Sequence, residues 1–256
     1  MAEITDFIQG LAREAGLLLA EKLTRHNPVY YKGTIDLVTE ADRMSEALIV
    51  ERIARRYPDH GILSEESAAR NERASARWII DPLDGTTNYA HGFPFFCVSI
   101  ALEKDGVVVL GAVYDPVRDE MFFAERGKGA FRNGKKITVS SETDLSRSLL
   151  ATGFPYDIRV SSDNNVNFFS AMIMKAQAVR RPGAAALDLS YLAAGRLDGF
   201  WELKLKPWDT AAGCLLVCEA GGMISDLSGG PWTLSSPGLV ATNGLIHGQM
   251  ITVLSD

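Results

Sequence analysis

Two aspartates three residues apart, Asp81 and Asp84, are the side chains of this sequence best suited to chemistry; they lie in the heptapeptide Asp-Pro-Leu-Asp-Gly-Thr-Thr. On a turn their carboxylates can converge with the Leu83 carbonyl. Mg²⁺ prefers such hard oxygen ligands, and water and substrate phosphate usually complete its coordination. Gly85 and Thr86, which follow, can open a helix whose amides face an anion. The segment predicts a metal-dependent hydrolase of phosphate esters.

The same heptapeptide also suits an ordinary surface turn, because Asp, Pro and Gly are the usual turn residues. Its neighbours weaken that alternative: an apolar strand is predicted at 78–80, and a second apolar run extends from Phe93 to Ala101. Pro82 lacks a backbone donor, so we expect it to stop the first strand directly after Asp81. The heptapeptide is therefore expected where a strand ends and a helix begins.

Three further carboxylates have ordinary explanations when each is considered alone. Glu65 can be a solvated glutamate at a helix end, since Glu is rarely buried unless it is paired. Asp209 can cap a helix predicted at 209–220, and Asp42 can favour a helix N-terminus by its charge. Their interpretation depends on whether distant parts of the chain form one site with the heptapeptide.

Several separated motifs resemble those of the inositol monophosphatase family, a group of Mg²⁺-dependent, lithium-sensitive phosphatases. They follow one another in the family's order over nearly the whole chain, and the ordered set is far more specific than any one motif. The motifs are Asp36-Leu37-Val38-Thr39 with Ala41-Asp42, Leu63-Ser64-Glu65-Glu66-Ser67, Trp78 to Asn88, Gly183 to Leu189, Asp198 to Glu202, and Pro207-Trp208-Asp209 with Ala211-Ala212-Gly213.

This resemblance implies two Mg²⁺ ions per subunit. Glu65, Asp81 and the Leu83 carbonyl would hold the first ion, and Asp81, Asp84 and Asp209 would hold the second. A shared carboxylate suits two ions about 3.5–4 Å apart, which can clamp the attacking and leaving oxygens. A third, weaker Mg²⁺ is expected near Glu65.

The resemblance also implies roles for the other site residues. Thr86 and Asp42 would be the catalytic pair that orients a water molecule and accepts its proton, since the metal lowers the pKa of that water. Ala184 stands where many relatives have Ser or Thr, which removes a hydroxyl from the pocket wall. The substrate-binding residues would be Gly85, Thr86, Gly183, Ala184, Ala185 and Glu202, the last contacting substrate hydroxyl groups.

The identity of the substrate stays open at this point. The expected partner is a small phosphorylated polyol or sugar: inositol 1-phosphate is favoured and fructose 1,6-bisphosphate is a close rival, with histidinol phosphate or NADP(H) also open. Arg180 and Arg181 can meet a second phosphate or form structural ion pairs. A regulatory binding protein is the alternative from a different class, because some bacterial relatives act through contacts with proteins or RNA polymerase.

Composition bounds these interpretations. The 256 residues carry a net charge of −6 and are 46% hydrophobic and 23% charged, as is ordinary for a globular protein. The acidic balance argues against nucleic acid as the main partner and against an anionic membrane. Three cysteines give no disulfide framework, and no apolar run approaches the roughly 18–20 residues of a membrane span. Acidic residues interrupt the N-terminus, so we expect no signal peptide and a cytoplasmic protein, which is also expected to form a homodimer.

Helices and strands are expected to alternate along the chain. Helical spacing predicts helices at 2–24 and 41–57, and a hairpin-like segment is predicted between them around Lys32-Gly33. Short strands dominate up to about residue 142, and strand and helix alternate afterwards. The predicted fold is α+β, a layered alternating α/β sandwich of the inositol monophosphatase and fructose-1,6-bisphosphatase type. We expect one domain, 1–256, of two closely packed halves, 1–142 and 143–256.

Overall fold

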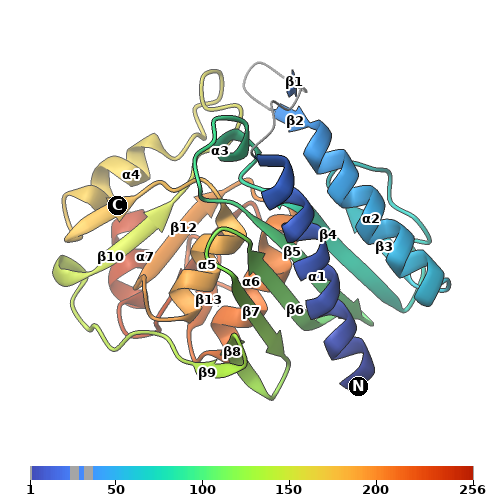
Figure 1. Cartoon of the computed structure of the whole chain (residues 1–256). Helices are drawn as coiled ribbons and strands as arrows, with labels where there is room; N and C mark the ends of the chain where they lie inside the picture. Colours follow the sequence, from blue (N-terminus) through green and yellow to red (C-terminus); the bar gives the residue numbers. More distant parts are fainter. Residues whose placement is uncertain (1, 24–28, 32–36, 256) are drawn as a thin grey trace.

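Layers of helices and sheets alternate through the molecule, as the computed structural model in Figure 1 shows. The structure describes residues 2–23, 29–31 and 37–255. Over these residues a helical pair, a seven-stranded sheet, a second helical pair, a five-stranded sheet and a third helical pair follow one another. The predicted layered α+β fold is confirmed.

The outer helical pair at the N-terminal end forms close to its predicted bounds. α1 (Ala2–Leu23) and α2 (Glu40–Arg56) pack against each other and against one face of the large sheet. Between them β1 (Val29–Tyr31) and β2 (Leu37–Thr39) pair antiparallel, and the turn expected around Lys32-Gly33 lies outside the described residues. Thr39 then caps α2 by accepting a hydrogen bond from the Asp42 amide.

The large sheet has the strand order β3-β4-β5-β6-β7-β8-β9. β3 is parallel to β4, and every other neighbouring pair is antiparallel, as expected for strands joined by short turns. The strands are β3 (Gly61–Ser64), β4 (Ala76–Asp84), β5 (Cys97–Lys104), β6 (Val107–Asp115), β7 (Glu120–Glu125), β8 (Gly129–Arg132) and β9 (Lys135–Ile137).

Both faces of this sheet are apolar because helices cover both of them. Successive strand residues point to opposite faces, so Trp78 and Ile80 of β4 join the core beneath α1 and α2, whereas Ile79 joins the core on the other side. That second core includes Leu189 of α5 (Ala185–Ala193) and Leu216 of α6 (Pro207–Glu219). A nearly continuous hydrophobic run in β4 follows from burial on two sides.

The smaller sheet has the order β11-β10-β12-β14-β13 and packs its inner face on α5 and α6. Its outer face is covered by α4 (Val166–Ile173) and α7 (His247–Ser255), with Trp201 at the centre of that outer core. The strands are β10 (Leu149–Thr152), β11 (Ala178–Arg180), β12 (Gly199–Leu203), β13 (Met223–Ser225) and β14 (Gly238–Thr242).

The structure differs from the predicted elements mainly around the heptapeptide. β4 continues through Pro82 to Asp84, so the expected end of the strand at Asp81 is wrong. The ladder to β5 shifts register between Asp81, opposite Ser99, and Asp84, opposite Cys97. Pro82 lies inside this irregularity, where its missing donor is tolerated, because a proline within a sheet is confined to edges and bulges.

Candidate active site

The turn after β4 is fixed by a glycine. Gly85 has φ 95°, a left-handed conformation that L side chains rarely adopt, and it leads into the short helix α3 (Thr86–Ala90). A Cβ atom at Gly85 would lie 2.9 Å from the Phe95 carbonyl oxygen and 3.3 Å from the Ala184 side chain. Only glycine lets the heptapeptide turn at this close approach. The predicted helix start is therefore present, one residue after the strand.

A pocket of about 470 Å³ opens at this turn. Its wall draws on the end of β4, on β12, and on the first turns of α5 and α6, so segments more than a hundred residues apart meet there. Of the residues assigned from the sequence to metal binding, catalysis or substrate binding, Asp42 alone does not line it. Those in the wall are Glu65, Asp81, Leu83, Asp84, Gly85, Thr86, Gly183, Ala184, Ala185, Glu202 and Asp209.

Asp42 lies directly behind the pocket wall and contacts it through Thr86. The Thr86 hydroxyl is 3.0 Å from Asp42 Oδ1 and 3.1 Å from the Leu83 carbonyl oxygen. The other Asp42 oxygen, Oδ2, accepts the Thr39 amide at 2.7 Å and also the Thr39 hydroxyl. Asp42 is fully buried, and burial raises its pKa while the hydrogen bonds from Thr39 and Thr86 oppose that rise. A Thr86 hydroxyl that donates to Asp42 keeps its lone pairs free to accept a proton from a water molecule.

The pocket concentrates buried negative charge. Burial raises the pKa of Asp84 and of Asp209 to about 7 each, and that of Glu202 to about 8. Burial and the charges of Glu65, Asp84 and Asp209 raise the pKa of Asp81 well above its usual range. Like charges removed from water disfavour one another's ionised forms. A bound cation would supply the charge that makes the ionised cluster favourable.

The donor set fits a hard divalent cation. It offers carboxylate oxygens and a backbone carbonyl, with neither thiolate nor imidazole among the proposed ligands, which is the chemistry that Mg²⁺ selects. As placed, no group of three or more His, Cys, Asp or Glu in the described part of the chain is gathered closely enough to hold an ion. Two carboxylates instead bind backbone amides: Asp84 Oδ2 accepts Ala186 N–H at 2.7 Å and Asp209 Oδ2 accepts Lys206 N–H at 2.6 Å.

The wall around Glu202 is built for close contact. Gly153 packs directly against the Glu202 carboxylate, so a side chain at position 153 would displace that carboxylate from its present position. On the opposite side Gly183 has φ 90°, and the Asn88 amide fixes this loop by donating to the carbonyl oxygens of Phe95 (2.7 Å) and Pro182 (2.8 Å). Ala184 precedes α5 without a side-chain cap, and the Asp84 carboxylate caps this helix instead.

Two lysines of the pocket and one buried carboxyl group near it were not identified from the sequence. Lys204 and Lys206 line the pocket on either side of Leu205, directly before the Pro-Trp-Asp motif. Of the two arginines that the sequence offered for a second phosphate, Arg181 lines the pocket and Arg180 does not. Asp188 is 1% exposed in the first turn of α5, Oδ1 has no hydrogen-bond partner among the described residues, and burial raises its pKa well above the usual range. Its signal in the sequence was a lone acid within the apolar run 184–193.

Comparisons with known proteins place the chain in a family. The model of the inositol monophosphatase family matches residues 1–256. An inositol-1-monophosphatase of Synechocystis sp. is 48% identical over 221 residues, covering 86% of this chain and 77% of that protein. The Nus factor SuhB of Escherichia coli K12 is 42% identical over 248 residues, covering 96% and 93%. The structure of an inositol monophosphatase from Anabaena (Nostoc) sp. superposes with a TM-score of 0.91 at 44% identity, over 99% of this chain and 96% of that one. The chain therefore belongs to the inositol monophosphatase family and is a phosphoric monoester hydrolase.

Proposed function

We propose that the protein is a Mg²⁺-dependent phosphomonoesterase that hydrolyses a small polyol phosphate, with inositol 1-phosphate as the favoured substrate. One observation carries the proposal. A single pocket of about 470 Å³ brings together carboxylates from β4, from β12, from α6 and from the segment after β3, and the Thr86–Asp42 pair lies at its wall. That size suits a small ligand. The names of the Synechocystis and Anabaena relatives support the same substrate class.

The metal ligands in this proposal are those assigned from the sequence. Glu65, Asp81 and the Leu83 carbonyl would hold one Mg²⁺, and Asp81, Asp84 and Asp209 a second, with a third, weaker ion near Glu65. When bound, Mg²⁺ supplies positive charge that polarises the phosphoryl group and makes water a better nucleophile. To reach an ion, the Asp84 and Asp209 side chains would turn away from the backbone amides whose hydrogen bonds they now accept. Binding the ion would offset the loss of those hydrogen bonds.

Water activation is assigned to the Thr86–Asp42 pair. Asp42 is held by Thr39 and cannot move far, and it fixes the Thr86 hydroxyl as a hydrogen-bond donor toward α2. The free lone pairs of Thr86 then face the pocket that Thr86 lines. Thr86 would accept a hydrogen bond from the attacking water. As that water gives up its proton toward Thr86, the Asp42 carboxylate would stabilise the positive charge that develops on the Thr86 hydroxyl.

Substrate recognition is assigned to the opposite wall. Glu202 would contact the hydroxyl groups of the leaving alcohol, and Gly183, Ala184 and Ala185 would let it approach the backbone closely. Gly85 and Thr86 would contribute amides to the phosphate. Arg181 lines the pocket, which keeps a bisphosphate such as fructose 1,6-bisphosphate as the rival substrate.

A regulatory role is the second candidate function. The observation that favours it is the name of the Escherichia coli relative, a Nus factor, at 42% identity over most of both chains. The acidic composition argues against a role in which nucleic acid is the main partner. We also propose a cytoplasmic homodimer. None of the helices in the described ranges combines the length and apolarity that a membrane crossing requires.

Phosphate release from a substrate panel tests the proposal. Inositol 1-phosphate, fructose 1,6-bisphosphate, histidinol phosphate, NADP(H) and an aryl phosphate would be incubated with Mg²⁺, with chelator, and with Mg²⁺ plus Li⁺. We expect turnover with Mg²⁺ alone, fastest for inositol 1-phosphate, and inhibition by Li⁺. Undiminished turnover in chelator would contradict the metal requirement. No turnover of any substrate would favour the regulatory role.

A further inference from the structure

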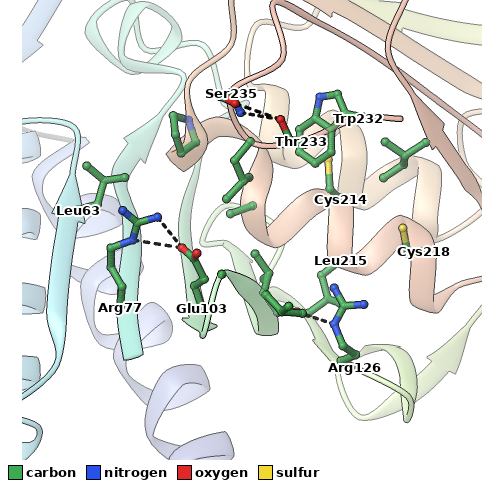
Figure 2. A pocket seen from close by; sticks show the side chains of 17 residues that line it. Leu63, Arg77, Glu103, Arg126, Cys214, Leu215, Cys218, Trp232, Thr233 and Ser235 are labelled. Carbon is green, nitrogen blue, oxygen red and sulfur yellow. Dashed lines mark hydrogen bonds and ion pairs between the residues drawn. The ribbon is translucent and has the colours of Figure 1, made fainter. Parts of the chain in front are cut away.

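A second pocket, larger than the candidate active site, lies on the other side of α6. Its volume is about 780 Å³, within the range of small-molecule sites, and none of the described residues lines both pockets. Figure 2 shows α6 as its back wall: Cys214, Leu215 and Cys218 face the open space. With Pro207 and Ala211 they follow helical spacing, so one whole face of α6 belongs to this pocket.

The lining combines apolar side chains with an aromatic ring. Trp232 is half-buried in the loop after β13, and no hydrogen bond of its indole N–H lies within the described chain. Leu63, Val108 and Ile224 add aliphatic surface around the same space. A half-buried aromatic ring that lines a pocket favours a flat apolar group packed against it.

Charge at the pocket is positive although the chain is acidic. Arg77 and Arg126 line it together with a single carboxylate, Glu103, in a protein of net charge −6. Glu103 is already paired with Arg77, whose Nε and terminal nitrogen donate to Glu103 Oε2 at 3.1 and 2.6 Å. The surplus charge is therefore on Arg126.

Arg126 is held in place with its terminal nitrogens free. Its Nε donates to the Val108 carbonyl oxygen at 2.8 Å, and its two terminal NH₂ groups have no acceptor among the described residues. The nearby carboxylate of Glu219 is committed elsewhere, since it accepts the amides of Gly127 and Gly129 at 2.8 Å each. A guanidinium fixed in this way presents a fork suited to a carboxylate, sulfonate or phosphate.

We propose that this pocket binds a small amphiphilic anion, with its flat apolar body against Trp232 and α6 and its anionic group at Arg126. In Figure 2, Trp232 lies above α6 and Arg126 lies below it, which sets the order of the two parts of the ligand. The proposed occupant is a small molecule because the charge to be matched is a single exposed guanidinium beside a largely apolar wall.

A ligand bound in this pocket would alter the candidate active site through α6. This consequence rests on the proposed function. The first turn of α6 carries Pro207 into this pocket and Trp208 and Asp209 into the other. β3 makes a second link, because Leu63 lines this pocket and Glu65, two residues later, lines the other. A ligand that shifts either element moves a proposed Mg²⁺ ligand, so the site would be regulatory.

The probe for the experiment is 8-anilinonaphthalene-1-sulfonate, a flat apolar anion whose fluorescence reports binding. Equilibrium titration of the folded, full-length protein should give one saturable site. Arg126→Gln should weaken binding roughly threefold to tenfold, given that this guanidinium is exposed. Arg55→Gln, which removes the same charge from the exposed end of α2, is the matched control and should bind like the parent.

A variant that fills the pocket tests whether the probe binds there. Cys218→Trp places a large ring in the pocket from an exposed position of α6 and should abolish saturable binding, whereas Cys218→Ser should preserve it. Circular dichroism and melting temperature would confirm that all variants fold. Unchanged affinity in Cys218→Trp would overturn the proposal because the probe would then be bound elsewhere.

Activity measurements distinguish binding in this pocket from an effect of that binding on catalysis. The KM and kcat for inositol 1-phosphate would be measured with and without the probe, in the parent and in Cys218→Trp. The probe should change the parent's kinetics and leave those of Cys218→Trp unaltered. Binding without a kinetic change would overturn the coupling through α6 but not the site. An absence of turnover before any probe is added would contradict the proposed function instead.

Discussion

At the scale of single residues, the site holds more negative charge than its surroundings stabilise. Asp81 is 2% exposed and Asp84 is 9% exposed, yet both belong to a cluster whose pKa values are raised chiefly by burial. A structural role would favour apolar side chains at such positions, because buried carboxylates are costly without a counter-charge. Strongly perturbed pKa values in a cleft are the signature of a functional site.

Asp84→Asn should lose most activity while the fold is kept. The amide retains one acceptor oxygen for Ala186 N–H, so α5 stays capped, but it removes the charge that would balance a divalent cation. We expect turnover to fall roughly a hundredfold or more and the melting temperature to stay equal or rise, since one of several repelling charges is gone. Kinetics and thermal unfolding measure this, with the exposed Asp59→Asn as control. Parent-like hydrolysis would reduce Asp84 to a turn residue.

Glu202→Gln and Thr86→Ala should separate recognition from chemistry. Glu202 is assigned to the leaving group, so its loss should raise the KM for polyol phosphates about tenfold or more while an aryl phosphate is affected little. Thr86→Ala should instead lower kcat for every substrate, because water activation is common to all. Steady-state kinetics on both substrate types distinguish these outcomes. Equal damage to polyol and aryl phosphates by Glu202→Gln would assign that carboxylate to the catalytic group.

At the scale of helices and strands, regular segments could be predicted from the sequence, whereas close contacts between segments distant in the chain could not. α1 and α2 follow from periodicity, because each buries one face of an amphipathic helix against the large sheet. β3 was missed because it is short and buried along nearly its whole length, which leaves no alternating pattern, and the extension of β4 through Pro82 depends on a register shift against β5 that no local signal encodes. The heptapeptide indicated the chemistry of the site, but Lys204 and Lys206 line it only through tertiary packing.

One junction between elements should make stability depend on pH. His247 begins α7 and bridges two strands: Nδ1 lies 3.0 Å from the Thr242 hydroxyl and Nε2 lies 2.9 Å from the Ser225 hydroxyl. Ser225 donates to the Asp226 carbonyl oxygen, so Nε2 is the protonated nitrogen and Nδ1 accepts from Thr242. A second proton on the ring would remove the acceptor of the Thr242 hydroxyl.

The sign of this effect follows from the pKa. Burial lowers the pKa of His247 below its usual 6.5, so the unfolded chain binds a proton that the folded chain does not. The contribution to stability is complete above about pH 6.5 and is lost as the pH falls from there toward the folded-state pKa. His247→Gln should therefore flatten the dependence of melting temperature on pH between about 7.5 and 5, whereas the exposed His91→Gln should not. An unchanged slope in His247→Gln would show that other groups cause the acid sensitivity.

At the scale of the whole molecule, the candidate active site draws on both sheets and on the first turns of the two helices, α5 and α6, that lie between them. Glu65, Asp81 and Asp84 belong to the large sheet and the segment after β3, while Glu202 is on β12 of the small sheet. α5 and α6 pack against both sheets, so neither sheet has a core of its own on its inner face. We propose on this ground that residues 1–142 and 143–256 are halves of a single domain.

Mg²⁺ should therefore stabilise the entire fold. An ion held by Asp81 and Asp84 from β4 together with Asp209 from α6 would bind the folded chain and not the unfolded one. At a free concentration about 100 times its dissociation constant, such an ion adds about 2.7 kcal/mol to the free energy of unfolding, which is roughly 5–10 °C in melting temperature for a domain of this size. Scanning calorimetry with Mg²⁺ and with chelator measures the shift, and a single transition in both conditions would show that the halves unfold together. Asp84→Asn should reduce the shift, while Asp59→Asn should retain it. A melting temperature that is indifferent to Mg²⁺ in the parent protein would mean that these carboxylates do not form the metal site.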